Sequence, residues 1–90
     1  MDIYLGEWEN DVACGEGILI SSNGERYEGQ MRNGKKNGEG TFYYADGRVF
    51  KGKWDNDQIH GYGAEEGAYF YEGEWRRGVK HGKGYLKLKD

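Results

Sequence analysis

The stretch YEGEWRRGVKHGKGYLKL, residues 71–88, alternates its side chains as a β-strand requires. Tyr71 and Trp75 fall on one face of an extended chain and the glutamates between them on the other, because successive strand residues point to opposite faces. Arg77-Gly78 then stands where a two-residue hairpin turn is expected. The glycine-spaced residues that follow begin a return strand, so the stretch predicts a β-hairpin.

Three other segments share this pattern. In each copy an aromatic residue is followed two positions later by Gly, four later by Trp or Met, and eleven later by the first Gly of a GxG pair. The offsets between copies are 23, 23 and 21 residues, and four copies in one phase indicate a repeat protein. The copies are YLGEWENDVACGEG from Tyr4, YEGQMRNGKKNGEG from Tyr27, FKGKWDNDQIHGYG from Phe50 and YEGEWRRGVKHGKG from Tyr71.

The glycines follow the repeat. All 17 stand after the aromatic residue, in a GxG pair or at a turn, and no GxGxxG occurs, which disfavours a separate phosphate-binding loop. Glycine inside a strand leaves no side chain to pack. Its repetition here predicts that aromatic rings lie against bare backbone of the neighbouring strand. Cross-strand aromatic pairs contribute about 0.2 to 1 kcal/mol each, so rows of rings would stabilise a thin sheet.

A second set of turns, at Asn23-Gly24, at Asp46-Gly47 and near Gly67, joins each hairpin to the next. The third repeat is two residues shorter, so its link should be shorter or irregular. No segment shows the period of a capped amphipathic helix. The expected fold is all-β: a single-layer, twisted antiparallel meander of about eight strands, forming one domain over residues 1–90 with repeats starting near 4, 27, 50 and 71.

Composition disfavours several classes of protein. Aromatic residues make up 16% of the chain, which argues against disorder, and the net charge of -3 argues against binding to nucleic acid. The single cysteine, Cys14, allows no internal disulfide and indicates a reducing compartment. No apolar run is long enough to span a membrane, and the first residues lack the regions of a signal peptide. We therefore expect a cytoplasmic protein.

The combination of YxGxW, NGxxHGxG and DG resembles the MORN (membrane occupation and recognition nexus) repeat over residues 4–88. This resemblance implies an elongated twisted sheet with one hairpin per repeat, whose consensus rings line a groove. It also implies a non-catalytic scaffold or protein-binding function, associated with the cytoskeleton or a membrane, or an accessory region of a larger enzyme. The residues that depart from the family pattern are Met31, Phe50, Cys14 and Asn37.

Cys14, His60 and His81 have the right chemistry to bind zinc. They occupy one position of the repeat, however, and equivalent positions lie on the order of 10 Å apart if each repeat adds two strands. We therefore expect them to be structural. Neither a nucleophilic triad nor a convincing pair of catalytic carboxylates can be assembled, so the sequence predicts no enzyme, no metal and no cofactor.

The row of aromatic residues is the predicted protein-binding groove. Because the expected sheet has no second layer, an apolar strip would stay partly open on one face and offer a recognition surface. The alternative is that packing of rings on glycine buries most of the strip. Association with another copy is a variant, because the first and last strands are open edges. The predicted anchors for a segment or helix of a partner protein are Tyr27, Met31, Phe50, Trp54, Tyr71 and Trp75.

Basic residues near the end of the chain give a second hypothesis. They would contact an anionic lipid surface, including phosphoinositides, or an acidic partner, at about 1 kcal/mol per basic residue near a membrane. The alternative is that lysines protect an edge strand from pairing. Residues 1–47 hold four Lys/Arg against nine Asp/Glu, and residues 48–90 hold nine against seven, an asymmetry that would orient association. The candidate residues are Arg76, Arg77, Lys80, Lys83, Lys87 and Lys89.

Overall fold

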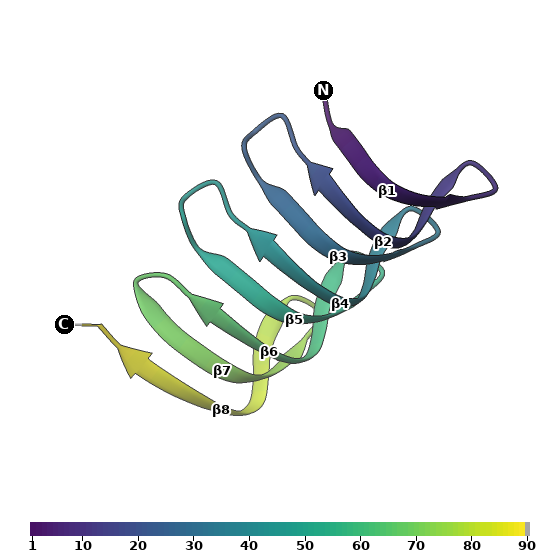
Figure 1. Ribbon diagram of the computed structural model, residues 1–90. Coiled ribbons are helices and arrows are strands. Elements are labelled where there is room, and N and C mark those ends of the chain that lie inside the picture. The colour runs from purple at the N-terminus through teal and green to yellow at the C-terminus, as the bar shows by residue number, and fades with distance from the viewer. Residues whose placement is uncertain (90) are drawn as a thin grey trace.

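A computed structural model describes residues 1–89 and shows one sheet of eight antiparallel strands in sequential order (Figure 1). Every strand pairs with its neighbours in the chain, so each connection is a hairpin. The predicted all-β meander is confirmed. The strands are β1 (Ile3–Glu9), β2 (Val12–Ile20), β3 (Arg26–Arg32), β4 (Lys35–Tyr43), β5 (Val49–Asp55), β6 (Gln58–Glu66), β7 (Tyr69–Arg76) and β8 (Val79–Leu88). Residues 1–89 contain no helix that could cross a membrane.

The turn inside each repeat places two residues in the left-handed region of backbone conformation. Asn33 and Gly34 have φ values of 52° and 77°, and Arg77 and Gly78 have values of 50° and 84°. Two consecutive residues with positive φ give the turn whose twist matches that of the flanking strands. The expected hairpin turns are confirmed at these positions and at the other two repeats.

The links between repeats differ in length, as the sequence predicts. Five residues separate β2 from β3 and β4 from β5, whereas Gly67 and Ala68 alone separate β6 from β7. The short link is closed by a hydrogen bond that Gly67 N donates to Tyr69 O, at 3.0 Å. The missing two residues of the third repeat therefore shorten this hairpin and leave its strands paired.

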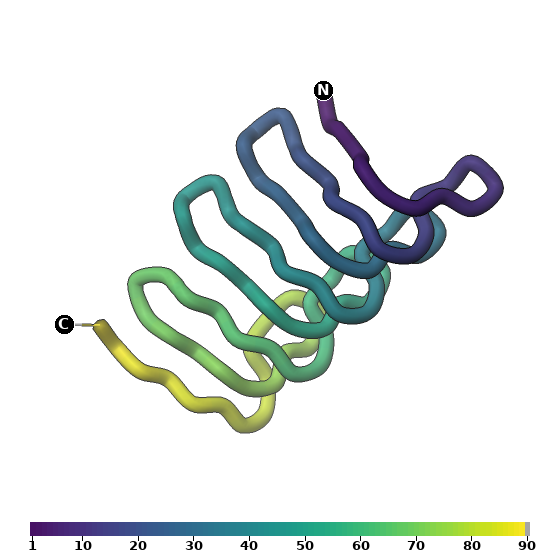
Figure 2. Tube along the Cα trace, in the orientation of Figure 1, coloured from purple at the N-terminus to yellow at the C-terminus, as the bar shows by residue number. Residues whose placement is uncertain are grey.

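The hairpin inside each repeat also carries a β-bulge, whereas the strand pairs that join one repeat to the next carry none. These bulges were not expected from the sequence. In the first hairpin Gly6 pairs with Gly17 and Trp8 with Ala13, so one residue of β1 faces three residues of β2. Gly15, the first glycine of the GxG pair, has a φ of 95° in this bulge. Bulges bend strands and increase twist, and the sheet accordingly coils like a spring with its ends at opposite ends of the molecule (Figure 2).

The core is a row of aromatic side chains on one face, which we call the ring face. A Cβ added at Gly63 would lie 2.6 Å from Cε1 of Phe50, which shows that the ring rests on bare backbone as predicted. Trp54 packs edge-on against Tyr27 and Phe50, with ring centroids 5.4 and 5.5 Å apart. Trp75 packs in the same way against Phe50 and Tyr71, at 5.2 and 5.5 Å. Each of these tryptophans thus joins its own repeat to the preceding one.

Candidate functional site

The six predicted anchors lie together on the ring face and are buried. Their exposed fractions range from 0% at Phe50 to 8% at Tyr71, so they form the floor of the face and offer little area for direct contact. Their role in binding stays a prediction. Partly buried rings pack against this floor and line its open rim, and they were not among the predicted anchors; they are Tyr4, Phe42, Tyr44 and Tyr69.

A shallow hollow of about 320 Å³ opens on the ring face between Phe42, Tyr44 and Trp54. No other element within residues 1–89 lies over it, because the sheet is a single layer. The hollow is bordered by Lys36, whose Nζ lies 5.4 Å from the centroid of Phe42 and 5.6 Å from that of Trp54. A cation placed over aromatic faces is held there by the ring quadrupole. Asp57, 3.8 Å from this Nζ, and Glu25 line the same hollow, so the ring face combines apolar surface with charged groups of both signs.

Lys80 holds the same position in the fourth repeat as Lys36 in the second, and it repeats this arrangement. Its Nζ lies 4.9 Å from the centroid of Trp75 and 5.2 Å from that of Tyr71. Burial opposes the charge of Lys80, but the Tyr69 hydroxyl and the Glu65 carboxylate outweigh it, and the pKa of Lys80 is raised. This lysine was expected among the candidate lipid contacts, whereas the structure places it on the ring face.

Glu65 is a buried carboxylate that the sequence analysis missed. It is 5% exposed, and it pairs with Arg48 Nη1 at 3.2 Å and with Lys80 Nζ at 3.1 Å. The Tyr69 hydroxyl donates to Glu65 Oε1, the oxygen that also pairs with Lys80, at 3.0 Å. Its position in the repeat is held by Leu19 and Phe42 in the first two copies, so a charge at an otherwise apolar position was the available signal.

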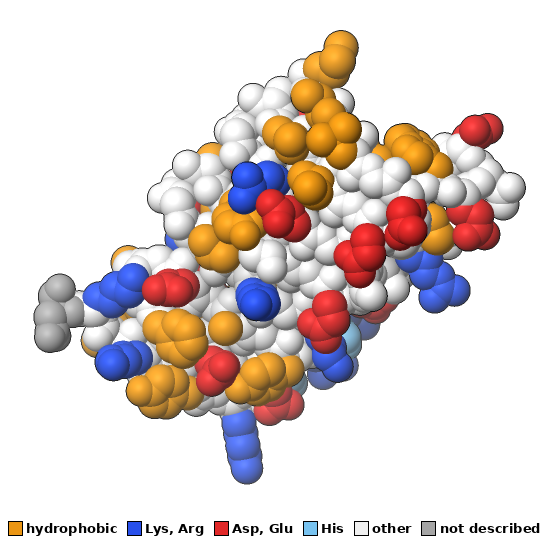
Figure 3. Space-filling model, viewed as in Figure 1, with side chains coloured by type: hydrophobic (Ala, Val, Ile, Leu, Met, Phe, Trp, Pro, Cys, Tyr) orange, Lys and Arg blue, Asp and Glu red, His pale blue; other side chains and the backbone are white. Residues whose placement is uncertain are grey.

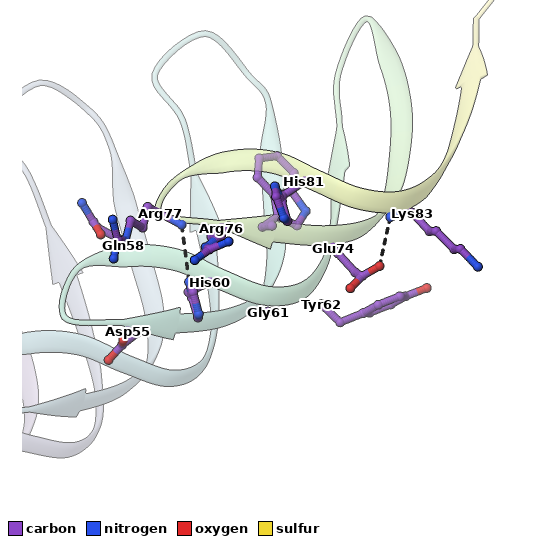
Figure 4. Close-up of a pocket in the computed structure, with 11 residues that line it drawn as sticks. Asp55, Gln58, His60, Gly61, Tyr62, Glu74, Arg76, Arg77, His81 and Lys83 are labelled. Carbon is purple, nitrogen blue, oxygen red and sulfur yellow. Dashed lines mark hydrogen bonds between the residues drawn. The ribbon is translucent and has the colours of Figure 1, made fainter.

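The six basic residues of the second hypothesis do not form one patch. Arg76, Arg77 and Lys83 line a hollow of about 1030 Å³ over β6, β7 and β8, on the face opposite the rings (Figure 4). Two carboxylates, Asp55 and Glu74, line the same hollow and reduce its positive charge. The other three lie apart from it: Lys80 on the ring face, Lys87 opposite Phe70 in the β7–β8 register, and Lys89 3.6 Å from Glu66.

His60 on β6 and His81 on β8 border this hollow from the two strands that flank β7. Nδ1 of His60 accepts a hydrogen bond from Arg77 N at 3.4 Å, across the junction between repeats three and four. Asn37 Oδ1 accepts one from Asn56 N at 3.2 Å in the equivalent place. This repeat position therefore ties the second repeat to the turn of the third, and the third to the turn of the fourth. Among the described residues no three His, Cys, Asp or Glu side chains gather at a spacing that would hold a metal ion.

Three side chains stabilise the bulges, and the sequence analysis did not identify them. Oε1 of Glu7 accepts a hydrogen bond from Glu16 N at 2.6 Å, and Oε1 of Gln30 accepts one from Glu39 N at 2.8 Å. Glu74 does the same for Lys83 N at 2.9 Å. The signal in the sequence was the recurrence of Glu or Gln at one repeat position, which the third copy lacks.

Comparison with known families agrees with this geometry. The model of the MORN repeat matches the chain four times, at residues 4–26, 27–47, 50–68 and 71–90. A search of curated proteins finds no match. MORN repeats serve in general as modules that interact with proteins or lipids. Four matches that together span almost the whole sequence, on a sheet with one hairpin per match, show that the chain belongs to the MORN-repeat family.

Proposed function

We propose that the protein is a non-catalytic interaction module that binds a segment of another protein on its ring face. The observation that carries this proposal is the uncovered single layer: partly buried Phe42 and Tyr44 border a hollow with no other described element over it. Lys36 and Lys80 lie on the same face, each beside a carboxylate, Asp57 and Glu65 respectively. An extended or helical segment with apolar and charged side chains would match this surface in both respects.

The rim of the ring face is the part to test, because changes to its floor would act through stability. The double variant Phe42→Ala/Tyr44→Ala removes two rim rings. Tyr62→Ala/Tyr85→Ala is the matched control, since these two tyrosines are 56% and 58% exposed and lie in the opposite phase of their strands. Both variants keep the glycine pairs and the buried rings.

The experiment is capture of binding proteins from a cell extract, followed by mass spectrometry, with circular dichroism to check the fold. We expect the rim variant to retain about one tenth or less of each specific partner, a loss typical of truncated aromatic anchors. The control variant should capture the same proteins as the original chain. Equal capture by all three, or loss in the control alone, would contradict the proposal.

A second candidate, the binding of anionic lipid headgroups, rests on the hollow lined by Arg76, Arg77 and Lys83. Liposomes with and without phosphoinositide test it by co-sedimentation at low and high salt. We expect binding that salt weakens and that Arg76→Glu/Arg77→Glu removes, while the control Lys51→Glu/Lys53→Glu on β5 retains it. Binding lost equally in both variants would indicate a general charge effect, and no binding would reject this candidate.

Either function is expected inside the cell, at the cytoskeleton or a membrane surface. Support for this location comes from the lone Cys14, since unpaired thiols persist best in reducing compartments. Fluorescence microscopy of the tagged chain tests the proposal, and delivery to the secretory pathway would contradict it.

A further inference from the structure

Trp8 differs from the two other tryptophans although all three hold the same repeat position. It is 59% exposed, whereas Trp54 and Trp75 are 7% and 6% exposed. The buried pair each lie against a ring of the preceding repeat, and each donates Nε1–H to the carbonyl of the second GxG glycine there, at 3.2 Å. Within the described residues Trp8 packs edge-on against Tyr4 as its one aromatic neighbour, with centroids 4.9 Å apart. It is one half of a junction between repeats that no other repeat within residues 1–89 completes.

The other edge of the sheet carries the residues against which such a tryptophan would pack. Tyr71 holds the position of Tyr27 and Phe50, the two rings against which a tryptophan of the following repeat packs. Gly84 holds the position of the glycines that accept the indole N–H. Leu86 is 56% exposed, although its equivalents in the first two repeats pack against the core. Within the part of the chain that the structure describes, no tryptophan and no further strand covers the β8 edge.

We propose that β8 of one copy pairs with β1 of a second copy in the register used between repeats, so that copies associate head to tail. The internal junctions set that register, since Gly17 pairs with Gly29, Gly40 with Gly52 and Gly63 with Gly73. Continued by one repeat, it places Gly84 opposite Gly6 of the second copy. Trp8 of the second copy then covers Tyr71 and donates to the Gly84 carbonyl.

In the proposed register, the outer turns of two copies would meet as the turns of the second and third repeats meet inside one chain. There Asp57 N donates to Lys36 O at 2.9 Å, Lys36 N donates to Asp57 Oδ1 at 2.8 Å, and Lys36 Nζ lies 3.8 Å from that carboxylate. Lys80 and Asp11 hold these two positions at the outer edges. Two copies joined through β8 and β1 would thus form the same lysine and aspartate pair.

Charge favours this pairing over the other two ways of joining edges. Residues 1–11 contain four acidic residues and no Lys or Arg, whereas residues 79–89 contain four lysines and no acidic residue. Acidic side chains accordingly gather toward the β1–β2 hairpin and basic ones toward the end of β8 in the space-filling view (Figure 3). Two β1 edges or two β8 edges would repel, while unlike edges attract. The proposed register also sets Lys83 opposite Glu7, as Glu39 stands opposite Lys53 inside the sheet.

An interface between two different edges leaves one edge of each kind free, so association continues beyond a dimer. It involves the edges of the sheet and leaves the ring face open. Failure of this inference would therefore leave the proposed ring-face binding intact, and the purified chain tests the two separately.

The first experiment measures the mass of the purified chain by light scattering over a range of protein concentrations, at low and high salt. We expect the mass to rise past that of a dimer at low salt and to fall on adding salt. Trp8→Ala should remain monomeric under the same conditions, whereas Tyr62→Ala, which removes an equally exposed ring away from both edges, should associate like the original chain. A monomer throughout, growth that stops at two copies, or unchanged growth of Trp8→Ala would each overturn the inference.

The second experiment exchanges one charge pair. Glu7→Lys and Lys83→Glu each place like charges opposite one another, and each alone should weaken association about tenfold. An equimolar mixture should recover it, because every contact between the two variants again joins opposite charges. Both substituted residues are already present at the equivalent positions of other repeats, since Lys53 is the equivalent of Glu7 and Glu39 is the equivalent of Lys83. A mixture that associates no better than the separate variants would overturn the inference.

Discussion

At the scale of single residues, the paired glycines hold neighbouring strands at close approach. A Cβ added to Gly52 would lie 2.6 Å from Gly63 Cα and 2.7 Å from Tyr62 O, both backbone atoms that cannot move aside. We expect Gly52→Ala to lower the free energy of unfolding by about 2 to 3 kcal/mol, as overpacking does. Urea denaturation followed by circular dichroism measures this.

Gly67→Ala is the control for that substitution. Its Cβ would lie 2.7 Å from Cγ of Arg48, a flexible side chain, and its backbone is outside the left-handed region. We expect a change within about 1 kcal/mol, because the rigidity gained by the unfolded chain offsets a small adjustment of Arg48. Equal destabilisation at both glycines would contradict a specific role for the pairs.

The phenol of Tyr27 makes stability depend on alkaline pH. Burial, followed by the nearby carboxylates of Glu16 and Asp57, raises the pKa of Tyr27 far above its ordinary value of 10.0. Above pH 10.0 the unfolded chain releases this proton and the folded chain keeps it, so the free energy of unfolding falls by up to about 1.4 kcal/mol per pH unit.

Tyr27→Phe checks this dependence by urea denaturation at a series of pH values. At neutral pH the variant should lose about 1 kcal/mol, because Tyr27 Oη donates to Gln30 O at 2.7 Å. Above pH 10.0 its stability should fall less steeply than that of the original chain. Phe50 shows that phenylalanine fits the position, and parallel curves for the two proteins would reject the role of Tyr27.

At the scale of the hairpin, the third repeat lacks the side chain that stabilises the bulge elsewhere. Lys53 holds the position at which Glu7, Gln30 and Glu74 accept a backbone N–H, and an ammonium group cannot accept one. Lys53→Gln would supply an acceptor for Tyr62 N, the equivalent donor. We expect an increase of about 0.5 to 1 kcal/mol in the free energy of unfolding.

Lys51→Gln is the matched control, since it removes the same charge two residues away on the same face of β5. Its effect should be close to zero, because the residue is exposed and lies away from the bulge. Thermal denaturation of both variants makes the comparison. If the two substitutions shift the melting temperature equally, the effect belongs to net charge and the bulge contributes nothing.

At the scale of the whole molecule, each strand of the described residues pairs with its neighbours in the chain, which is typical of repeat proteins. All residues of β8 are exposed, while β5 and β6 contain several buried ones. We expect amide hydrogens of β8 to exchange fastest and those of β5 and β6 slowest, because opening at an edge breaks one junction. Hydrogen exchange mass spectrometry of the monomeric Trp8→Ala variant, with that of the associating chain as comparison, measures this order.

Association would change that order in a defined way. Pairing of β8 with β1 of a second copy should slow exchange in both edge strands and leave β5 and β6 unchanged. Protection that appears instead in the central strands would indicate stacking of ring faces. The two modes of association are therefore separable by the same measurement.

Much of the fold could be predicted because its determinants are local. The alternation of side chains around Tyr71 and Trp75 predicts the strand, and Arg77-Gly78 predicts the turn. Because four copies share this pattern, the prediction of one hairpin extends to the whole sheet. The bulges could not be predicted, because a glycine in a GxG pair can adopt either the extended conformation of a strand or a left-handed conformation with positive φ. The candidate site was harder still, since the exposed fraction of Trp54 depends on rings that other repeats supply.

The sequence by itself determined the number of hairpins, the positions of their turns and the face on which the rings gather, because these follow from residue order within 23 positions or fewer. Tertiary structure alone decided which rings are floor and which are rim, that Glu65 is buried between Arg48 and Lys80, and that Trp8 is left exposed. These features depend on which strand lies beside which, and a side chain is buried or exposed according to its neighbours across the sheet rather than its neighbours in the chain.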